Sequence, residues 1–302
     1  MGRSEFYGHG LPGVDVGALK GTLVVVEGAD GVGRSTHVAL IKDWLESHGR
    51  AVLETGISRS ALAGKGLRAA KDGHTLGGLT MNLFYATDFA DELEHRIIPA
   101  LRAGFVVLTD RYIYSLMARA AVRGADAQWV KGLYEFALKP QTVLYLRTTV
   151  DTLMTRVVQT AGFNYWESGM DLHLGDDMFD SFIEYQKRLR VEFDAMADEY
   201  GFHVVDASAS IDDVFSQIRG VLDPLLSPCR VRRLSSTPPN AQQPGRSKRK
   251  TAARHGEQGA HLQLEQERAQ RHHGGGEEQS KYKSNGGRAA HHHQLPPTDA
   301  LR

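Results

Sequence analysis

Residues 28–35 combine glycines, charges and a hydroxyl at a spacing that suits phosphate binding. They read G-A-D-G-V-G-R-S, which matches the pattern G-x-x-x-x-G-K-[ST] at every position except the lysine. Gly31 and Gly33 let the backbone curl so that successive N–H groups point inward, and the helix that follows presents its positive end to the same anion. The residues expected to surround the phosphates of ATP are Gly28, Asp30, Gly31, Val32, Gly33, Arg34, Ser35 and Thr36.

Arg34 stands where this pattern usually has lysine. Its planar guanidinium is larger than an ammonium and binds in a bidentate manner, so it can hold phosphate charge but lies farther from the transferring oxygen, which favours slower turnover. Ser35 is expected to place its hydroxyl on Mg²⁺. The alternative interpretation is a glycine-rich turn between a strand and a helix that binds no ligand.

A second charged pair follows another apolar run. The stretch F-V-V-L-T leads directly into Asp110 and Arg111. Beyond the carboxyl end of a parallel strand, the acid would hold Mg²⁺ through water and the arginine would hold phosphate, so we predict Ser35 and Asp110 as metal residues. An Asp-Arg pair after a strand also occurs as a simple helix cap with its ion pair.

Five short apolar runs, rich in β-branched residues, predict the strands that must position these groups. They cover residues 22–27, 51–54, 105–109, 142–146 and 202–205. Helical patterns lie between and around them, at residues 35–47, 60–71, 80–102, 113–123, 127–138, 150–160, 178–200 and 211–222. This alternation predicts a doubly wound, five-stranded parallel sheet in three α/β/α layers, with ligands beyond the carboxyl ends of the strands.

Residues 161–177, called the flap below, read A-G-F-N-Y-W-E-S-G-M-D-L-H-L-G-D-D and show no clear periodicity. Phe163, Tyr165 and Trp166 are costly to leave in water. We therefore predict that the flap closes over a site, with an ordinary surface loop as the alternative.

The composition changes near residue 226. This predicts an N-terminal extension over residues 1–19, one domain over residues 20–226 and a tail over residues 227–302. The tail holds 14 Lys and Arg against 6 Asp and Glu, whereas residues 1–226 hold 22 against 30. An acidic body argues against a specific nucleic-acid surface, although the basic tail could touch RNA non-specifically. Because it has few aliphatic residues, the tail is expected to be disordered.

Cysteine usage and hydropathy bear on the compartment. Cys229 is the single cysteine, so one chain cannot build a disulfide framework or a cysteine zinc site. No apolar run approaches the roughly 18 residues that a membrane span needs, and the start M-G-R-S-E-F lacks an apolar signal core. We expect a cytoplasmic protein without a membrane partner, and a homodimer is left open.

The order of the motifs resembles that of thymidylate kinases over roughly residues 20–222. The phosphate-binding turn is followed by Y-A-T-D at residues 85–88 and by I-P-A-L-R-A-G-F-V-V-L-T-D-R-Y at residues 98–112. The resemblance implies a P-loop kinase that uses ATP and Mg²⁺. Such a kinase transfers the γ-phosphoryl group to a nucleoside monophosphate, first of all to dTMP, giving dTDP.

Site roles follow from this resemblance residue by residue. It implies that Asp30 lies near Mg²⁺ and the sugar-phosphate end of the acceptor, and that Arg111 holds the acceptor phosphate. Arg34, Asp30 and Arg111 would then be the catalytic residues. The substrate-binding residues implied are Phe84, Tyr85, Arg59, Arg111 and Tyr112. Either Phe84 or Tyr85 would pack on the base, although both, taken alone, also fit a hydrophobic core.

Three departures from the family pattern concern the acceptor. Residues 55–58 read T-G-I-S instead of T-R-E-P, which leaves Arg59 as a stand-in for an arginine. Phe89 replaces an arginine expected near the base, and the flap lacks arginines, Arg156 on the preceding helix being the nearest. The alternatives are a deoxynucleoside kinase, which would need a carboxylate base for a 5′-hydroxyl, and an ATP-binding pseudo-kinase. A non-catalytic scaffold based on the tail ranks behind both.

Overall fold

One parallel sheet organises the part of the chain that the computed structural model describes, residues 4–74, 76–160 and 162–226. Its strands are β1 (Thr22–Gly28), β2 (Val52–Gly56), β3 (Val106–Asp110), β4 (Thr142–Arg147) and β5 (His203–Asp206). Their order across the sheet is β2-β3-β1-β4-β5. The predicted five-stranded parallel sheet is therefore confirmed, whereas the predicted tail and Cys229 lie outside the described residues.

β1 lies at the centre of the sheet. It pairs in parallel with β3 on one side and with β4 on the other, for example through Val26, which lies opposite Asp110 and Leu144. All seven residues of β1 are buried, because the run T-L-V-V-V-E-G has almost no polar side chain to expose on either face. The order of strands reverses beside β1, and such a reversal opens a crevice at the carboxyl ends where ligands bind.

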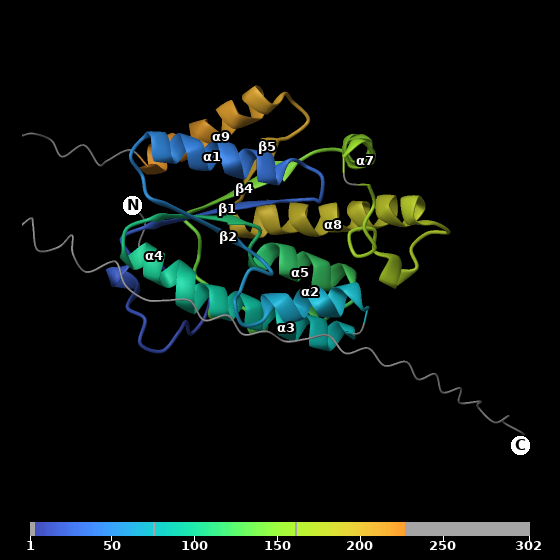
Figure 1. Cartoon of the computed structure of the whole chain (residues 1–302), viewed down its shortest axis with the longest axis horizontal. Helices are drawn as coiled ribbons and strands as arrows, with labels where there is room; N and C mark the ends of the chain where they lie inside the picture. Colours follow the sequence, from blue (N-terminus) through green and yellow to red (C-terminus); the bar gives the residue numbers. More distant parts are fainter. Residues whose placement is uncertain (1–3, 75, 161, 227–302) are drawn as a thin grey trace, which may run out of the picture. The chain divides into compact units, whose positions relative to one another are not determined.

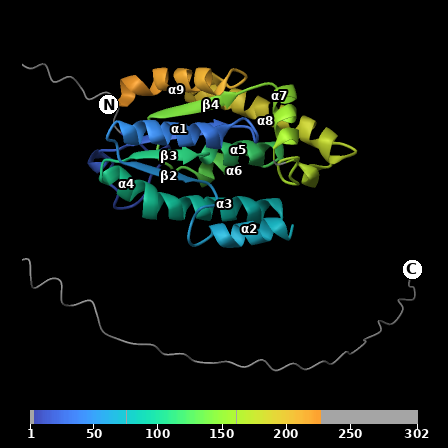
Figure 2. The ribbon, with the colours of Figure 1, turned by 45° about the horizontal axis from the view of Figure 1, so that its top comes forward.

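Helices cover both faces of the sheet and make three layers (Figure 1 and Figure 2). The α-helices in the described residues are α1 (Arg34–Ser47), α2 (Gly64–Asp72), α3 (Gly78–Glu92), α4 (Ile98–Arg102), α5 (Ile113–Val122), α6 (Ala127–Leu133), α7 (Val150–Gln159), α8 (Met178–Tyr200) and α9 (Ile211–Leu226). A π-helical turn, η2 (Leu93–Ile97), joins α3 to α4, and short 3₁₀ turns form η1 (Val16–Ala18) and η3 (Met170–Leu172). Within the described residues, none of the helices combines the length and the apolar character that crossing a bilayer requires.

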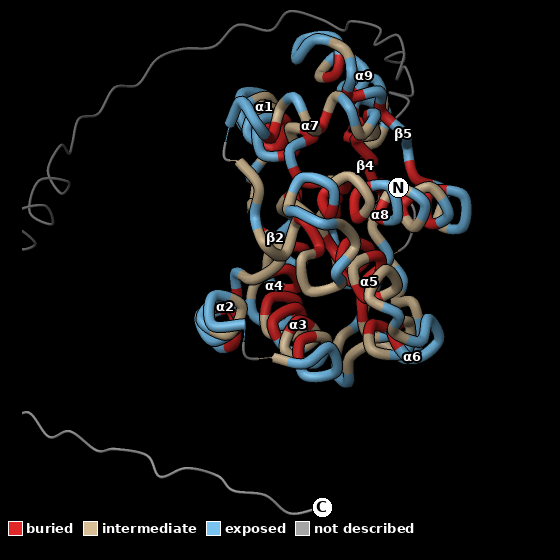
Figure 3. The backbone as a smooth tube through the Cα atoms, turned by 90° about the vertical axis from the view of Figure 1, so that its right-hand side faces the viewer, coloured by how far each residue is buried: buried red, intermediate tan, exposed pale blue. Residues whose placement is uncertain are grey.

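Alternate residues of β1 pack into two apolar clusters. On one face, Val24 packs with Ile41 of α1 and Ile218 of α9. On the other face, Val25 packs in a larger cluster that includes Tyr114 of α5 together with residues of α3, α4 and α8. Figure 3 shows the buried stretches concentrated in the strands and on the inner sides of the helices. The sheet is thereby held rigid, which fixes the turns at its carboxyl edge.

The predicted helix over residues 127–138 is too long, because α6 ends at Leu133. An antiparallel bridge joins Phe6 to Leu138, and the two N–H groups after Phe6 donate to carbonyls of the same stretch. Between the end of α6 and this bridge, the N–H groups of Tyr134, Glu135 and Ala137 donate to carbonyls three residues earlier, so the backbone forms tight turns instead of continuing the α-helix. Pro140 also disfavours helical geometry in the residue before it. The N-terminal extension thus packs on the domain through contacts that a local pattern does not encode.

Candidate active site

The turn after β1 has the geometry of a phosphate-binding turn. Gly28 has a φ of 144°, a conformation that favours glycine. A Cβ on Gly28 would lie 2.6 Å from the carbonyl oxygen of Leu146, so β4 approaches too closely for a side chain. Val32 is buried and anchors the turn in the core, whereas Ser35 is exposed in the first turn of α1. The predicted phosphate-binding residues therefore lie together at the positive end of α1.

Arg34 folds back onto this turn. Its Nε donates to Oδ1 of Asp110 at 2.8 Å, and its Nη1 donates to the carbonyl oxygens of Gly28, at 2.5 Å, and Ala29. Nη2 lies 3.6 Å from Oδ1 of Asp30, and the side chain is only 9 % exposed. The guanidinium thus fills the turn and ties it to the end of β3, a set of contacts that one ammonium could not make at the same time.

Ser35 and Asp110 meet where β1 and β3 end. The hydroxyl of Ser35 donates to Oδ2 of Asp110 at 3.4 Å. Hydroxyl and carboxylate oxygens are ligands that Mg²⁺ prefers, so this pair fits the ion. The described residues contain no group of three or more His, Cys, Asp or Glu side chains that would bind a metal by themselves.

Asp30 gathers three arginines although it is only 6 % exposed. Its Oδ1 pairs with Arg111 and lies 3.6 Å from Arg34, while its Oδ2 accepts a hydrogen bond from Arg119 at 2.9 Å. Burial, followed by the positive charge of Arg119, lowers the pKa of Arg111 to about 9, so this guanidinium remains charged at neutral pH. Its Nε is buried and has no partner in the described part of the chain. The cluster is therefore positive and retains a donor for an anion.

Glu27, at the end of β1, links this arginine cluster to the sheet. Its carboxylate accepts hydrogen bonds from the N–H of Tyr112 at 2.8 Å and from the hydroxyl of Ser115 at 2.6 Å. Burial raises the pKa of Glu27, while these hydrogen bonds and the charges of Arg34 and Arg111 act in the opposite direction. Glu27 thereby joins the D-R-Y turn after β3 to the end of β1.

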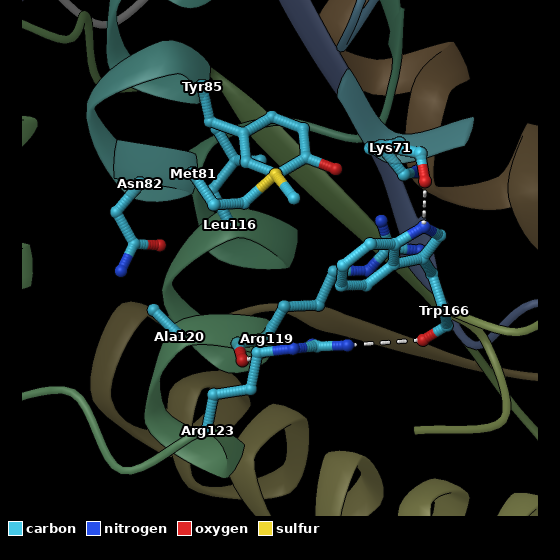
Figure 4. Close-up of a pocket in the computed structure, with 9 residues that line it drawn as sticks. All are labelled: Lys71, Met81, Asn82, Tyr85, Leu116, Arg119, Ala120, Arg123 and Trp166. Atoms are coloured by element: carbon cyan, nitrogen blue, oxygen red, sulfur yellow. Dashed lines mark hydrogen bonds between the residues drawn. The ribbon is translucent and has the colours of Figure 1, made fainter. Parts of the chain in front are cut away.

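A small cavity lies beside the arginines, between α3, α5 and the flap (Figure 4). Tyr85 and Met81 line it from α3, Leu116 and Arg119 line it from α5, and Trp166 closes it from the flap. Its volume is about 30 Å³, far below the roughly 300 Å³ of ordinary small-molecule pockets. In this arrangement the cavity is too small for a nucleobase.

The flap is fixed over the cavity by Arg123, the residue after α5. Its guanidinium donates to both carboxylate oxygens of Asp171, at 2.8 and 3.0 Å, and to the hydroxyl of Tyr185 at 2.6 Å. It also donates to the carbonyl of Trp166, whose indole N–H donates to the carbonyl of Lys71 in α2. The closure of the flap over a bound ligand stays a prediction.

Tyr85 lines the cavity, whereas the other four predicted substrate residues, Arg111, Phe84, Tyr112 and Arg59, do not. Phe84 packs against the larger apolar cluster. Tyr112 is 1 % exposed, and its hydroxyl donates to the carbonyl of Leu138 at 2.9 Å. Arg59, at the carboxyl end of β2, donates to Glu54 at 3.1 Å. Their roles in substrate binding stay predictions.

The departures from the family pattern have structural counterparts. Phe89 is buried and packs edge to face on Tyr112, with ring centroids 5.0 Å apart, so this position belongs to the core. Arg156 donates to the carbonyls of Val32 and Ala207 and joins the phosphate-binding turn to the loop after β5. The cations that line the cavity come instead from α5, the residue after it and α2.

The sequence patterns do not single out Glu27, Arg119 or Arg123, although all three shape the site. Ser115, Arg119 and Arg123 are spaced by four residues, which places them on one face of α5 and its end. That spacing, directly after D-R-Y, is the signal that could have identified the two arginines. Asp30, the partner of Arg119, is singled out by the phosphate-binding pattern, but nothing in the sequence shows that the two residues meet.

Comparisons with known proteins agree with the site. A family model for thymidylate kinase matches residues 26–218. Probable thymidylate kinase 2 of Saccharolobus solfataricus is 37 % identical over 207 residues, which cover 68 % of this chain and 96 % of the relative. Probable thymidylate kinase of Thermococcus gammatolerans is 32 % identical over 67 % of this chain and 96 % of its own. Thymidylate kinase of Brachyspira hyodysenteriae is 30 % identical over a stretch that covers 55 % of this chain and 83 % of the relative.

Proposed function

Because this chain belongs to the thymidylate kinase family, we propose that it transfers the γ-phosphoryl group of ATP-Mg²⁺ to dTMP, giving dTDP and ADP. The observation that carries this proposal is the shared edge of β1 and β3. There the phosphate-binding turn, the Ser35–Asp110 pair and the Arg111–Asp30 pair lie within contact of one another through Arg34. The relatives named thymidylate kinase support dTMP as the acceptor.

The reaction needs positioning and charge neutralisation more than acid–base chemistry. An oxygen of the acceptor phosphate attacks the γ-phosphorus in line, and the oxygen that bridges the β- and γ-phosphorus atoms leaves with ADP. The acceptor phosphate is already anionic at neutral pH, so no general base is required. Arg111 would hold the acceptor, and Arg34 would neutralise the charge between the two nucleotides.

Ser35 and Asp110 would hold Mg²⁺, which when bound neutralises charge on the phosphates of ATP. The ion pair between Arg34 and Asp110 keeps both groups in place before nucleotide arrives. A guanidinium that leaves Asp110 can turn toward the phosphates, since its Nη1 already lies at the backbone of the turn. Nothing in the described site favours a pseudo-kinase. The cytoplasmic location and the homodimer stay predictions.

Phosphoryl transfer by the full chain tests the proposal. The protein is incubated with ATP-Mg²⁺ and each nucleoside monophosphate in turn, while ADP release is followed and products are separated by chromatography. We expect the highest kcat/KM with dTMP and the formation of dTDP. Asp110→Asn should remove the activity, and Asp198→Asn, at an exposed position of α8, serves as the matched control. ATP binding without transfer to any monophosphate, or faster transfer to another base, would contradict the proposal.

A further inference from the structure

Arg119 lies between the arginine cluster and the cavity. It belongs to α5. Ser115, one turn earlier, binds Glu27, and Arg123, directly after the helix, binds the flap. Arg119 donates from Nη2 to Oδ2 of Asp30 at 2.9 Å, and its side chain also lines the cavity. One side chain therefore reaches both the phosphate-binding turn and the space below the flap.

Asp30 holds Arg119 and Arg111 close to each other. The two guanidiniums pair with the two different oxygens of this single carboxylate. Two guanidiniums that share a carboxylate are placed so that they can share a phosphate, which offers more acceptor oxygens in the same space. In the described residues, the buried Nε of Arg111 has no partner. The guanidinium of Arg119 donates one hydrogen bond within the same residues, to Asp30. Both therefore retain donors for a ligand.

The charges around the pair also point to an anion. Both guanidiniums pair with Asp30, and the pKa of Arg111 is lowered by burial first and by the positive charge of Arg119 second. Burial acts to lower the pKa of both arginines, and the negative charge of Glu167 in the flap is among the causes that act in the opposite direction. A phosphate dianion that enters from the cavity would meet Arg119 first and then Arg111, which pairs with the same carboxylate of Asp30.

Arg123 is not an equivalent candidate, although it also lines the cavity. Its guanidinium is occupied by Asp171, Tyr185 and the carbonyls of Trp166 and Arg119. These contacts hold the flap in place. Among the described residues that line the cavity, Arg119 is therefore the cation next to the phosphate-binding turn that keeps donors for a substrate.

We propose that Arg119 and Arg111 together bind the phosphate of the acceptor nucleotide, with Asp30 holding the two guanidiniums in position. The proposal rests on the function proposed above and adds Arg119 as a substrate-binding residue. Arg119 would thus discriminate a nucleoside monophosphate from the nucleoside itself, because only the former brings the anion. The sugar and base would lie farther along the cavity, toward Tyr85.

The test compares dTMP with thymidine in the full-length protein. Arg119→Met removes the charge at similar length, Arg119→Lys keeps the charge without the planar fork, and Arg188→Met on an exposed part of α8 is the control. The dissociation constant of dTMP is measured by calorimetry. The inhibition constant of thymidine and the KM for ATP are measured from the reaction.

We expect Arg119→Met to weaken dTMP binding about 10–100-fold, which corresponds to about 1.4–2.7 kcal/mol. The inhibition constant of thymidine and the KM for ATP should stay within about threefold of wild type, and Arg119→Lys should fall between wild type and Arg119→Met. A change in dTMP affinity below about threefold would overturn the proposal. An equal loss of affinity for thymidine and for dTMP would also overturn it, because it would mean that Arg119 contacts the nucleoside.

The two proposals fail in different ways. A wild-type protein that binds dTMP, and an Arg119→Met variant that binds it equally well, would overturn the role of Arg119 alone. A wild-type protein that binds another monophosphate instead of dTMP would overturn the proposed acceptor, and the same comparison would then use that monophosphate and its nucleoside. A wild-type protein that binds no monophosphate would overturn both proposals.

Discussion

Arg34→Lys separates the two tasks of the guanidinium in the phosphate-binding turn. In the structure, Arg34 bonds Asp110 through Nε and the carbonyls of Gly28 and Ala29 through Nη1. A lysine ammonium is one compact donor group, so it can keep the ion pair with Asp110 or the carbonyls but cannot span both. We therefore expect at least two of these hydrogen bonds to be lost.

The loss of these hydrogen bonds should lower the stability of the Arg34→Lys variant. Each lost hydrogen bond removes about 0.5–1.5 kcal/mol of net stabilisation, so two of them remove about 1–3 kcal/mol. For a domain of this size, each kcal/mol shifts the Tm by roughly 2–4 °C, which predicts a decrease of about 2–12 °C. The activity, in contrast, should be retained or increased, because the ammonium of lysine lies closer to the transferring oxygen and gives up fewer contacts when it turns to ATP.

The assay combines thermal unfolding, with and without ATP-Mg²⁺, and steady-state phosphorylation of dTMP. Arg188→Lys, which changes the same residue type in an exposed pair with Glu184 on α8, controls for a general effect of the substitution. A decrease in kcat of more than about tenfold, equivalent to about 1.4 kcal/mol of barrier, would refute the reasoning. It would mean that transfer itself depends on the guanidinium at Arg34.

Three further outcomes are expected. Asp110→Asn and Ser35→Ala should each lower kcat by at least about 100-fold with the fold intact by circular dichroism, because both act on the proposed Mg²⁺ site; a wild-type rate in either would exclude that role. In urea unfolding, the free energy by which wild type is more stable than Glu27→Gln should decrease as pH rises above about 4. Burial raises the pKa of Glu27, so the stabilisation that Glu27 contributes is complete only below its pKa in the unfolded chain. A difference in stability that stays constant or grows with pH would contradict this. Saturating dTMP should change tryptophan fluorescence because the flap must leave the cavity, and Trp166→Phe but not Trp129→Phe should remove most of that change; an unaltered signal in Trp166→Phe would argue against this motion.

The strands could be predicted from the sequence because their signal is local. In a parallel sheet covered on both faces, a strand is mostly apolar, and the run that forms β1 is buried at every residue, including Glu27. The turn after β1 is local for the same reason, since its glycines and its hydroxyl lie within a few residues of one another. Fold and phosphate-binding turn therefore follow from short stretches of sequence.

The end of α6 could not be predicted in this way. Its apolar pattern continues beyond Leu133, but the carbonyls that follow accept hydrogen bonds from the N-terminal segment, more than a hundred residues away in the sequence. The bridge between Phe6 and Leu138 depends on how that segment packs on the finished domain. A helical period gives no information about such long-range contacts.

The residues around the acceptor also depend on packing between segments that lie far apart in the sequence. The missing arginines of α3 and of the flap suggest a site poor in positive charge, yet Arg119 and Arg123 of α5 and its end line the cavity. Arg119 reaches Asp30, a residue 89 positions away, only because Glu27 fixes the start of α5 against the end of β1. The helical spacing after D-R-Y can show that the two arginines share a face, but not which carboxylate they meet. The positive charge that a phosphate acceptor needs is therefore set by how α5 docks on β1, and it need not appear in the segments where the family pattern places it.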